Sequence, residues 1–184
     1  MADLRRLTYV RPCKQSDDVF LYDVFCTTWQ SEVAALPNQN LARHVLRIQH
    51  IAQERRFAGR YPGHQRYVLM HEGEAAGRLY LHESGSTMQI VDLTLLPQFR
   101  HLGIGSRLLV DLMKQAVQDS AVITTEVGRR IKDVTGFLAA MGFDLVSVDD
   151  LDNHFEWRPT SVEAPAESLP LGQGAGAALR SVGR

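Results

Sequence analysis

The stretch of residues 90 to 118 constrains the fold of this chain more than any other. Ile90 to Leu95 is short and apolar with β-branched residues, and Pro97 stops it, which predicts a strand. From Arg107 to Gln118 apolar residues recur at helical spacing, which predicts a helix with one apolar face. A strand that leads into an amphipathic helix through a short loop is therefore the first structure to place.

The loop between this strand and this helix carries Arg100, Gly103 and Gly105. The first backbone N–H groups of a helix have no internal partner, and the helix dipole favours an anion. Glycines lack a Cβ, so phosphate oxygens can approach the backbone, and Arg100 adds a permanently charged planar group. A plain turn with two glycines is the simpler alternative. The complete Arg-x-x-Gly-x-Gly spacing favours a phosphate-binding loop.

Composition narrows the class of protein. The chain has 184 residues, 45% of them hydrophobic, which predicts one domain with a sizeable core. Its net charge of −1 favours neither nucleic acid nor a membrane surface as a partner. We see no membrane-spanning run, which needs roughly 18 apolar residues, and no signal-peptide pattern. Cys13 and Cys26 show no disulfide or metal-ligand spacing, so we expect a cytoplasmic protein without a metal site.

The remaining elements follow from periodicity and turn residues. In chain order we expect a strand at 7–11, helices at 16–35 and 41–59, strands at 66–71, 76–82 and 87–95, the helix at 107–118, a strand at 122–127, a helix at 131–141, and strands at 143–148 and 153–157. Pro, Gly, Ser and Ala dominate afterwards. We therefore expect a folded domain over 1–158 and a flexible tail over 159–184.

The segment Leu95-Leu-Pro-Gln-Phe-Arg-His-Leu-Gly-Ile-Gly-Ser106 resembles the acyl-CoA-binding motif of the GNAT superfamily of acyltransferases. His101 stands where that family often has glycine. The order of the expected elements also resembles the family. The resemblance implies an α/β (α+β) fold with a mixed, mostly antiparallel sheet of six to seven strands, flanked by about four helices. Its two central strands, at 87–95 and 122–127, would part to form a V-shaped cleft.

The resemblance also implies an activity: N-acetyl transfer from acetyl-CoA, as cosubstrate, to a primary amine of a small molecule or a protein, by direct attack in a ternary complex. The diphosphate of the coenzyme would lie on the backbone of seven loop residues: Arg100, His101, Leu102, Gly103, Ile104, Gly105 and Ser106. The backbone of Leu93 and Leu95 would pair with the pantetheine arm as one strand pairs with another. The N–H of Leu95 would also stabilise the oxyanion of the intermediate. Homodimers are common in the family, so the resemblance allows a homodimer.

The acceptor amine needs a route for its proton, because an alkylammonium has a reference pKa of about 10.4. Asp92 is the first candidate base, since it lies in an otherwise apolar strand beside the expected thioester. The alternative is a structural carboxylate that caps a loop or pairs with an arginine. Glu83, Glu126 and His82 are further candidates, and a route through ordered water without a dedicated base is also open.

Two departures from the family pattern bear on the mechanism. Many GNAT enzymes carry a tyrosine on the last helix, four residues before its closing Gly-Phe, and Leu138 occupies that position here. Ile131 stands where an asparagine is often found. The alternative function is therefore a non-catalytic module that binds acyl-CoA or another protein. A dinucleotide-binding fold is disfavoured, because Leu108 replaces its third glycine. For the acceptor pocket we expect aromatic walls at Trp29, Tyr61, Tyr80 and Trp157.

Overall fold

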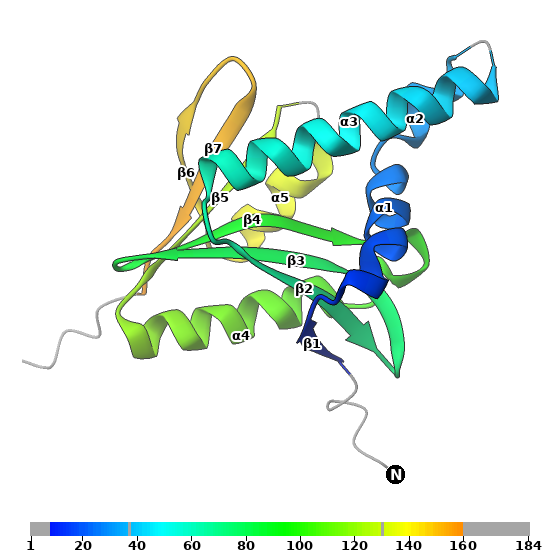
Figure 1. Ribbon diagram of the computed structural model, residues 1–184. Coiled ribbons are helices and arrows are strands. Elements are labelled where there is room, and N and C mark those ends of the chain that lie inside the picture. Colours follow the sequence, from blue (N-terminus) through cyan, green and yellow to red (C-terminus); the bar gives the residue numbers. More distant parts are fainter. Residues whose placement is uncertain (1–7, 37, 130, 160–184) are drawn as a thin grey trace, which may run out of the picture.

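A seven-stranded mixed sheet forms the centre of the protein (Figure 1). The computed structural model describes residues 8–36, 38–129 and 131–159. The strands are β1 Thr8–Pro12, β2 Gln65–His71, β3 Glu74–Ser84, β4 Thr87–Leu95, β5 Val122–Gly128, β6 Asp144–Val148 and β7 Asp152–Trp157, in the spatial order β1-β2-β3-β4-β5-β7-β6. Neighbouring strands pair antiparallel except β4 and β5, which pair in parallel. The expected fold is confirmed.

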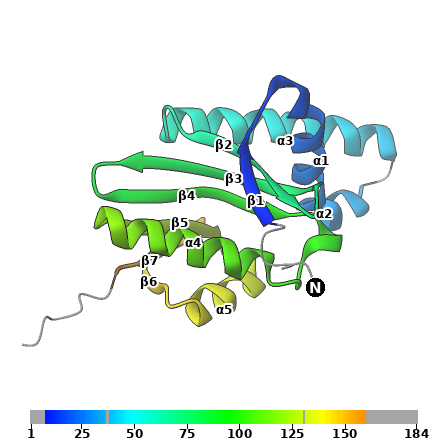
Figure 2. The same ribbon diagram turned by 90° about the horizontal axis from the view of Figure 1, so that it is seen from below.

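Helices cover both faces of the sheet (Figure 2). They are α1 Asp18–Thr27, α2 Gln30–Ala34 and α3 Gln39–Arg60 on one face, and α4 Ile104–Asp119 and α5 Lys132–Ala140 on the other. Short 3-10 turns, η2 Gln15–Asp17 and η3 Pro97–Phe99, precede α1 and α4. In the described part of the chain, no helix combines the length and apolar character needed to cross a membrane.

Two apolar cores lie on the two faces of the sheet. The larger packs α4 and α5 against the sheet, and includes Leu109 and Ile123, both with no exposed surface. The smaller packs α1 and α3 against β2 and β3 through side chains such as Leu21, Phe57 and Val68. Alternation along each strand therefore decides which face of the molecule a side chain serves.

The long helix expected at 16–35 is interrupted. Helix α1 ends at Thr27 and α2 begins at Gln30. The hydroxyls of Thr27 and Thr28 donate hydrogen bonds of 2.8 Å to the carbonyls of Val24 and Phe25. These side-chain bonds compete with the regular helical pattern, and hydrophobic periodicity does not reveal them. The tail expected from residue 159 lies outside the described residues apart from Pro159.

The central strands β4 and β5 part from each other, as the resemblance implied. They pair only from Thr87 with Val122 to Ile90 with Thr125, although β4 continues to Leu95. A bulge marks the point of separation: Tyr80 of β3 faces Asp92, whereas Leu81 faces Ile90, so Val91 has no partner in that register. Bulges bend a strand and increase its twist. We call the point where pairing ends, beside Ile90 and Thr125, the apex of the cleft.

Candidate functional site

The loop before α4 presents its backbone to the open end of the cleft. His101 and Gly103 both have positive φ, +60° and +75°, and no side chain in the described residues caps α4. The first intrahelical bond runs from the N–H of Arg107 to the carbonyl of Gly103, at 3.0 Å. The N–H groups of the preceding helical residues are therefore the ones that face outward at the helix start. Such a run of N–H groups, with alternating backbone conformation, suits an anion.

The two loop glycines differ in role. A Cβ on Gly103 would meet open space, but its positive φ favours glycine. A Cβ on Gly105 would lie 3.7 Å from Phe137 and 3.9 Å from Leu95, inside the protein. The missing Cβ of Gly105 therefore serves the packing of α4 against β4 and α5, and the approach of a phosphate depends on its N–H group.

Arg100, in the loop before α4, contacts β4 and α1 at the open end, or mouth, of the cleft. Its Nε donates to the carbonyl of Leu95 at 3.0 Å, and its Nη2 donates to Thr27 Oγ1 at 3.5 Å. The side chain is exposed. A permanent positive charge therefore lies close to the outward N–H groups of α4, where both favour the same anion.

The open edge of β4 carries the backbone groups expected to hold the pantetheine arm. The N–H of Leu96 donates to Ala76 of β3 at 2.9 Å. Because N–H groups alternate along a strand, those of Leu95 and Leu93 point the other way, toward the gap between β4 and β5. The side chains of both leucines pack into the larger core.

Asp92 forms an ion pair with a buried arginine. Arg78 is 1% exposed, and its Nη2 donates to Asp92 Oδ2 and to Gln53 Oε1. Its Nη1 lies 3.4 Å from the carbonyl of Leu21. The other oxygen of Asp92 accepts from the hydroxyl of Thr94 at 2.6 Å. Pairing with an arginine was the alternative left open by the sequence, and it is present here.

A second group of polar residues lies at the apex, on the face covered by α3. Glu126 is the first residue of β5 beyond its last pair with β4. Its Oε1 lies 2.5 Å from Arg60 Nη2 and 3.5 Å from His154 Nδ1. His154 Nε2 lies 2.8 Å from Asp149 Oδ2. Together with Tyr61, whose pKa is raised to about 12 by burial and by the neighbouring Glu126, these residues are called the apex cluster.

The sequence named only part of this group. Glu126 and His82 were candidates, and the His82 ring lies 5.7 Å from that of Tyr61. His154 and Asp149 were missed as site residues, because the antiparallel register of β5 and β7 pairs residue 126 with 154 and no local pattern encodes it. Glu83 lies elsewhere, on the wall of a cavity on the opposite face.

Only part of the expected aromatic wall faces the cleft. Trp157 packs into the larger core, 3.7 Å from the position of a Cβ on Gly142, so its assignment to the acceptor pocket was wrong. Three residues earlier on β7, His154 points to the opposite face, toward Glu126. Tyr80 is fully buried, which leaves Trp29 and Tyr61 as partly exposed aromatic residues on the α1–α3 face.

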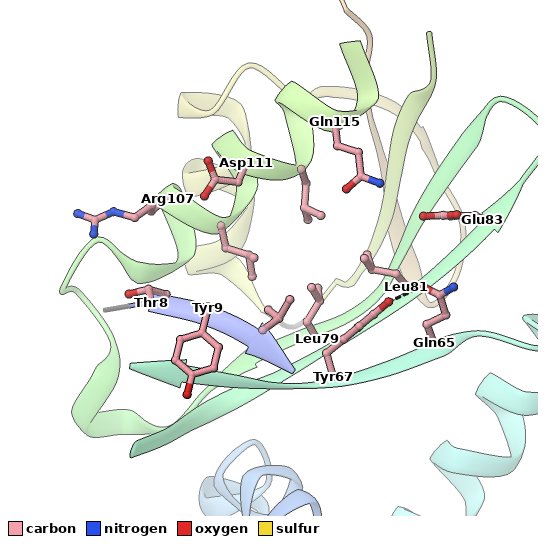
Figure 3. Close-up of a pocket in the computed structure, with 13 residues that line it drawn as sticks. Thr8, Tyr9, Gln65, Tyr67, Leu79, Leu81, Glu83, Arg107, Asp111 and Gln115 are labelled. Atoms are coloured by element: carbon pink, nitrogen blue, oxygen red, sulfur yellow. Dashed lines mark hydrogen bonds between the residues drawn. The ribbon is translucent and has the colours of Figure 1, made fainter. Parts of the chain in front are cut away.

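A cavity of about 350 Å³ lies between α4 and strands β1 to β3 (Figure 3). Its apolar lining comes from Leu79 and Leu81 of β3 on one side and from Leu108 and Leu112 of α4 on the other. Tyr67 points into it (Figure 3). Its lining includes neither the loop at 100–106 nor the open edge of β4. It is therefore separate from the cleft.

The splayed seven-stranded sheet, with an uncapped helix start beside its open edge, is the architecture of the GNAT acyltransferases. The acetyltransferase (GNAT) family profile matches residues 21–143, and the chain belongs to that family. Family membership supports acyltransferase activity. The chain has no match among curated proteins.

Solved structures of the family share the fold at low identity. The PaiA N-acetyltransferase of Thermoplasma acidophilum, solved with coenzyme A, is 17% identical, with a TM-score of 0.62 over 83% of this chain and 99% of that one. An acetyltransferase from Thermus thermophilus is 16% identical, with a TM-score of 0.60 over 83% and 97%. A GNAT acetyltransferase from Elizabethkingia anophelis, solved with acetyl-CoA, is 14% identical, with a TM-score of 0.54 over 84% and 99%.

Proposed function

We propose that this protein is a cytoplasmic N-acetyltransferase that transfers an acetyl group from acetyl-CoA to a primary amine. The observation that carries the proposal is the position of the uncapped start of α4 directly beside the open edge of β4. A ligand with a charged diphosphate joined to an extended amide-containing arm matches both features at once. Two solved structures with this fold contain coenzyme A or acetyl-CoA, which supports the same ligand.

The ligand would lie along the cleft from its mouth to its apex. The diphosphate would accept hydrogen bonds from the N–H groups at 104–106, with Arg100 and the backbone of 101–103 beside it. The pantetheine arm would then run along β4 and pair with Leu95 and Leu93. Since the N–H groups of Leu95 and Leu93 both point into the gap, the thioester carbonyl would accept a hydrogen bond from Leu95 or, nearer the apex, from Leu93.

The reaction would be a direct attack. A neutral amine adds to the thioester carbon, the C–N bond forms, and the C–S bond then breaks to release the thiol of coenzyme A. A thiol of pKa about 8.5 is a fair leaving group even as the thiolate. Leu138 is 4% exposed and packs in the larger core, so this position of α5 offers no acid. Asp92 remains a candidate base, although both of its oxygens accept hydrogen bonds within the protein.

Release of free thiol from acetyl-CoA tests the proposal. The full-length protein is mixed with acetyl-CoA and a panel of small amines, amino acids and lysine-containing peptides, and thiol is followed with time. We expect sustained release with at least one amine, and an acetylated product of the expected mass. Release that is independent of every amine, or no release at all, would refute it.

The second candidate is a binding module that holds acyl-CoA without turnover. The apolar environment of Leu138 favours it, because the phenol found there in many relatives is absent. Acetyl-CoA binding measured by calorimetry separates the two: micromolar binding without thiol release supports the module.

We also propose that the protein forms a homodimer through β6. This strand is at the edge of the sheet, and Leu145, Val146 and Val148 are each more than half exposed. An edge strand with apolar side chains on both faces invites pairing with a second chain.

A further inference from the structure

We propose that His154, held by Asp149, accepts the proton of the acceptor ammonium, and that Glu126 binds that ammonium at the apex of the cleft. The inference rests on the proposed acetyl transfer and names the groups that make the amine reactive. Asp92 is less suited to this task, because Arg78 and Thr94 already donate to its two oxygens. In Glu126, by contrast, Arg60 and His154 both approach the same oxygen, Oε1.

The first step is the location of the pair. Glu126 and His154 are directly opposite residues of β5 and β7, so their side chains lie on the same face. Glu126 follows the last residue of β5 that pairs with β4. Both side chains are about one-fifth exposed, at 20% and 23%. They are therefore at the apex end of the gap into which the N–H groups of Leu95 and Leu93 point, and they remain reachable from solvent.

The second step is the orientation of the imidazole. Asp149 Oδ1 accepts from the backbone N–H groups of Leu151 and Asp152, both at 2.8 Å, which fixes the carboxylate. Its Oδ2 lies 2.8 Å from His154 Nε2. A carboxylate can only accept, so the neutral imidazole carries its hydrogen on Nε2; Nδ1 and Glu126 Oε1 then face each other as two acceptors 3.5 Å apart, which an ammonium between them would join.

The third step is the charge around the pair. Arg60, the last residue of α3, pairs with Glu126, and Tyr61 directly after the helix contributes an un-ionised hydroxyl. Strand β3 contributes His82 beside that tyrosine. Backbone hydrogen bonds, first that from Asp152, and His154 lower the pKa of Asp149 and keep it ionised. Arg56 of α3 is a second guanidinium near Tyr61, so the carboxylates of Glu126 and Asp149, which flank the imidazole, are balanced by two arginines farther from it. A cation that enters between Glu126 and His154 therefore meets the carboxylate of Glu126 first.

The proton balance is complete. The ammonium gives one proton to Nδ1 of His154, and the neutral amine attacks the thioester carbon. As the C–S bond breaks, the second proton passes from the new amide nitrogen to the sulfur. The imidazolium then loses the proton on Nδ1 to water, since the His154 side chain is 23% exposed, and the hydrogen on Nε2 stays toward Asp149.

The test compares pH profiles of kcat/KM for the amine in the full-length protein. General base catalysis contributes roughly 10² to 10⁴, so His154→Gln should lower kcat at least about 100-fold and remove the acidic limb of the profile. Asp149→Asn keeps Oδ1 but places an N–H opposite Nε2, which reverses the tautomer, so we expect a loss of about tenfold or more. Glu126→Gln should mainly raise the KM for the amine. His44→Gln, on the exposed face of α3, is the matched control. It should leave kcat, the KM for the amine and the pH profile unchanged.

Acetyl-CoA affinity and Tm are measured for every variant, and we expect all to bind acetyl-CoA as the native protein does. If His154→Gln and Asp149→Asn both keep the native kcat and pH profile, the relay is wrong while the acetyl transfer stands. If these variants have a lower Tm but the native kcat and pH profile, the apex cluster is an ion network that stabilises the packing of α3 on the sheet. If the native protein acetylates no amine, the proposed function fails and the relay fails with it.

Discussion

Replacing Gly77 with alanine should displace the open edge of β4 without touching any polar group of the cleft. A Cβ on Gly77 would lie 2.2 Å from the carbonyl oxygen of Thr94 and 3.0 Å from Cα of Leu95. Both atoms are backbone, so no side chain can rotate away. An ordinary contact needs about 3.4 Å, so the two strands must separate by about 1.2 Å. Overpacking of this kind costs about 1 to 3 kcal/mol.

The displaced segment is the one that would hold the pantetheine arm. A misplacement of about 1 Å can cost about 100-fold in rate, so we expect kcat/KM to fall by about that factor, and Tm to fall by about 3 to 10 °C. Thermal unfolding and the thiol-release assay measure the two effects. The control is Gly59→Ala in α3, where a Cβ meets no described atom within 4 Å and should stabilise the helix by about 0.5 to 1 kcal/mol. Native Tm and native kcat/KM in Gly77→Ala would refute the reasoning.

Four further outcomes follow from single contacts. Gly103→Asp places a carboxylate at the uncapped start of α4 and should abolish acetyl-CoA binding. Gly105→Ala makes only ordinary van der Waals contacts and should keep that binding. Equal acetyl-CoA affinity of the two variants in calorimetry would contradict the loop assignment. Arg78→Met leaves Asp92 as an unpaired, mostly buried charge and should cost about 3 to 5 kcal/mol in urea unfolding, much of which the double variant with Asp92→Leu should recover. Hydrogen bonds from Arg11 and from the N–H of Lys14 lower the pKa of Asp17. The contribution of Asp17 to stability is therefore present above the ordinary pKa of an aspartate and disappears as the pH falls. Asp17→Asn should lower Tm at pH 7 and reduce the difference in Tm between pH 7 and pH 3. Val146→Lys should shift the protein to the monomer in sedimentation at unchanged Tm per chain, and a native profile that is already monomeric contradicts the β6 dimer.

The sequence predicted the elements whose signal is local. The strand from Thr87 to Leu95 has the expected bounds, because Pro97 ends it. Helix α4 was expected from Arg107 but begins at Ile104, since Gly103 in the left-handed region starts the helix before its apolar face becomes periodic. The break between α1 and α2 depends on two threonine hydroxyls and could not be predicted from hydrophobic spacing.

The candidate site divides in the same way. The phosphate loop is contiguous, so its residues could be named from one motif. The partner of Asp92 could not, because Arg78 lies on another strand and in the sequence resembles any charged residue of a hairpin. The same holds for Glu126 and His154, which the β5–β7 register brings together from 28 positions apart. The register between distant strands depends on how the whole sheet pairs, and it cannot be predicted from a single sequence.

Amide hydrogen exchange with and without acetyl-CoA tests the central assignment most directly. The backbone of residues 91–95 and 100–106 should exchange more slowly when the ligand is bound, because the open edge of β4 and the start of α4 then have hydrogen-bond partners. The backbone amides of the residues that line the cavity beneath α4, such as Tyr67, should exchange at the same rate with and without acetyl-CoA. Protection confined to that cavity, or no protection along β4, would contradict the assignment of the cleft to the acyl carrier.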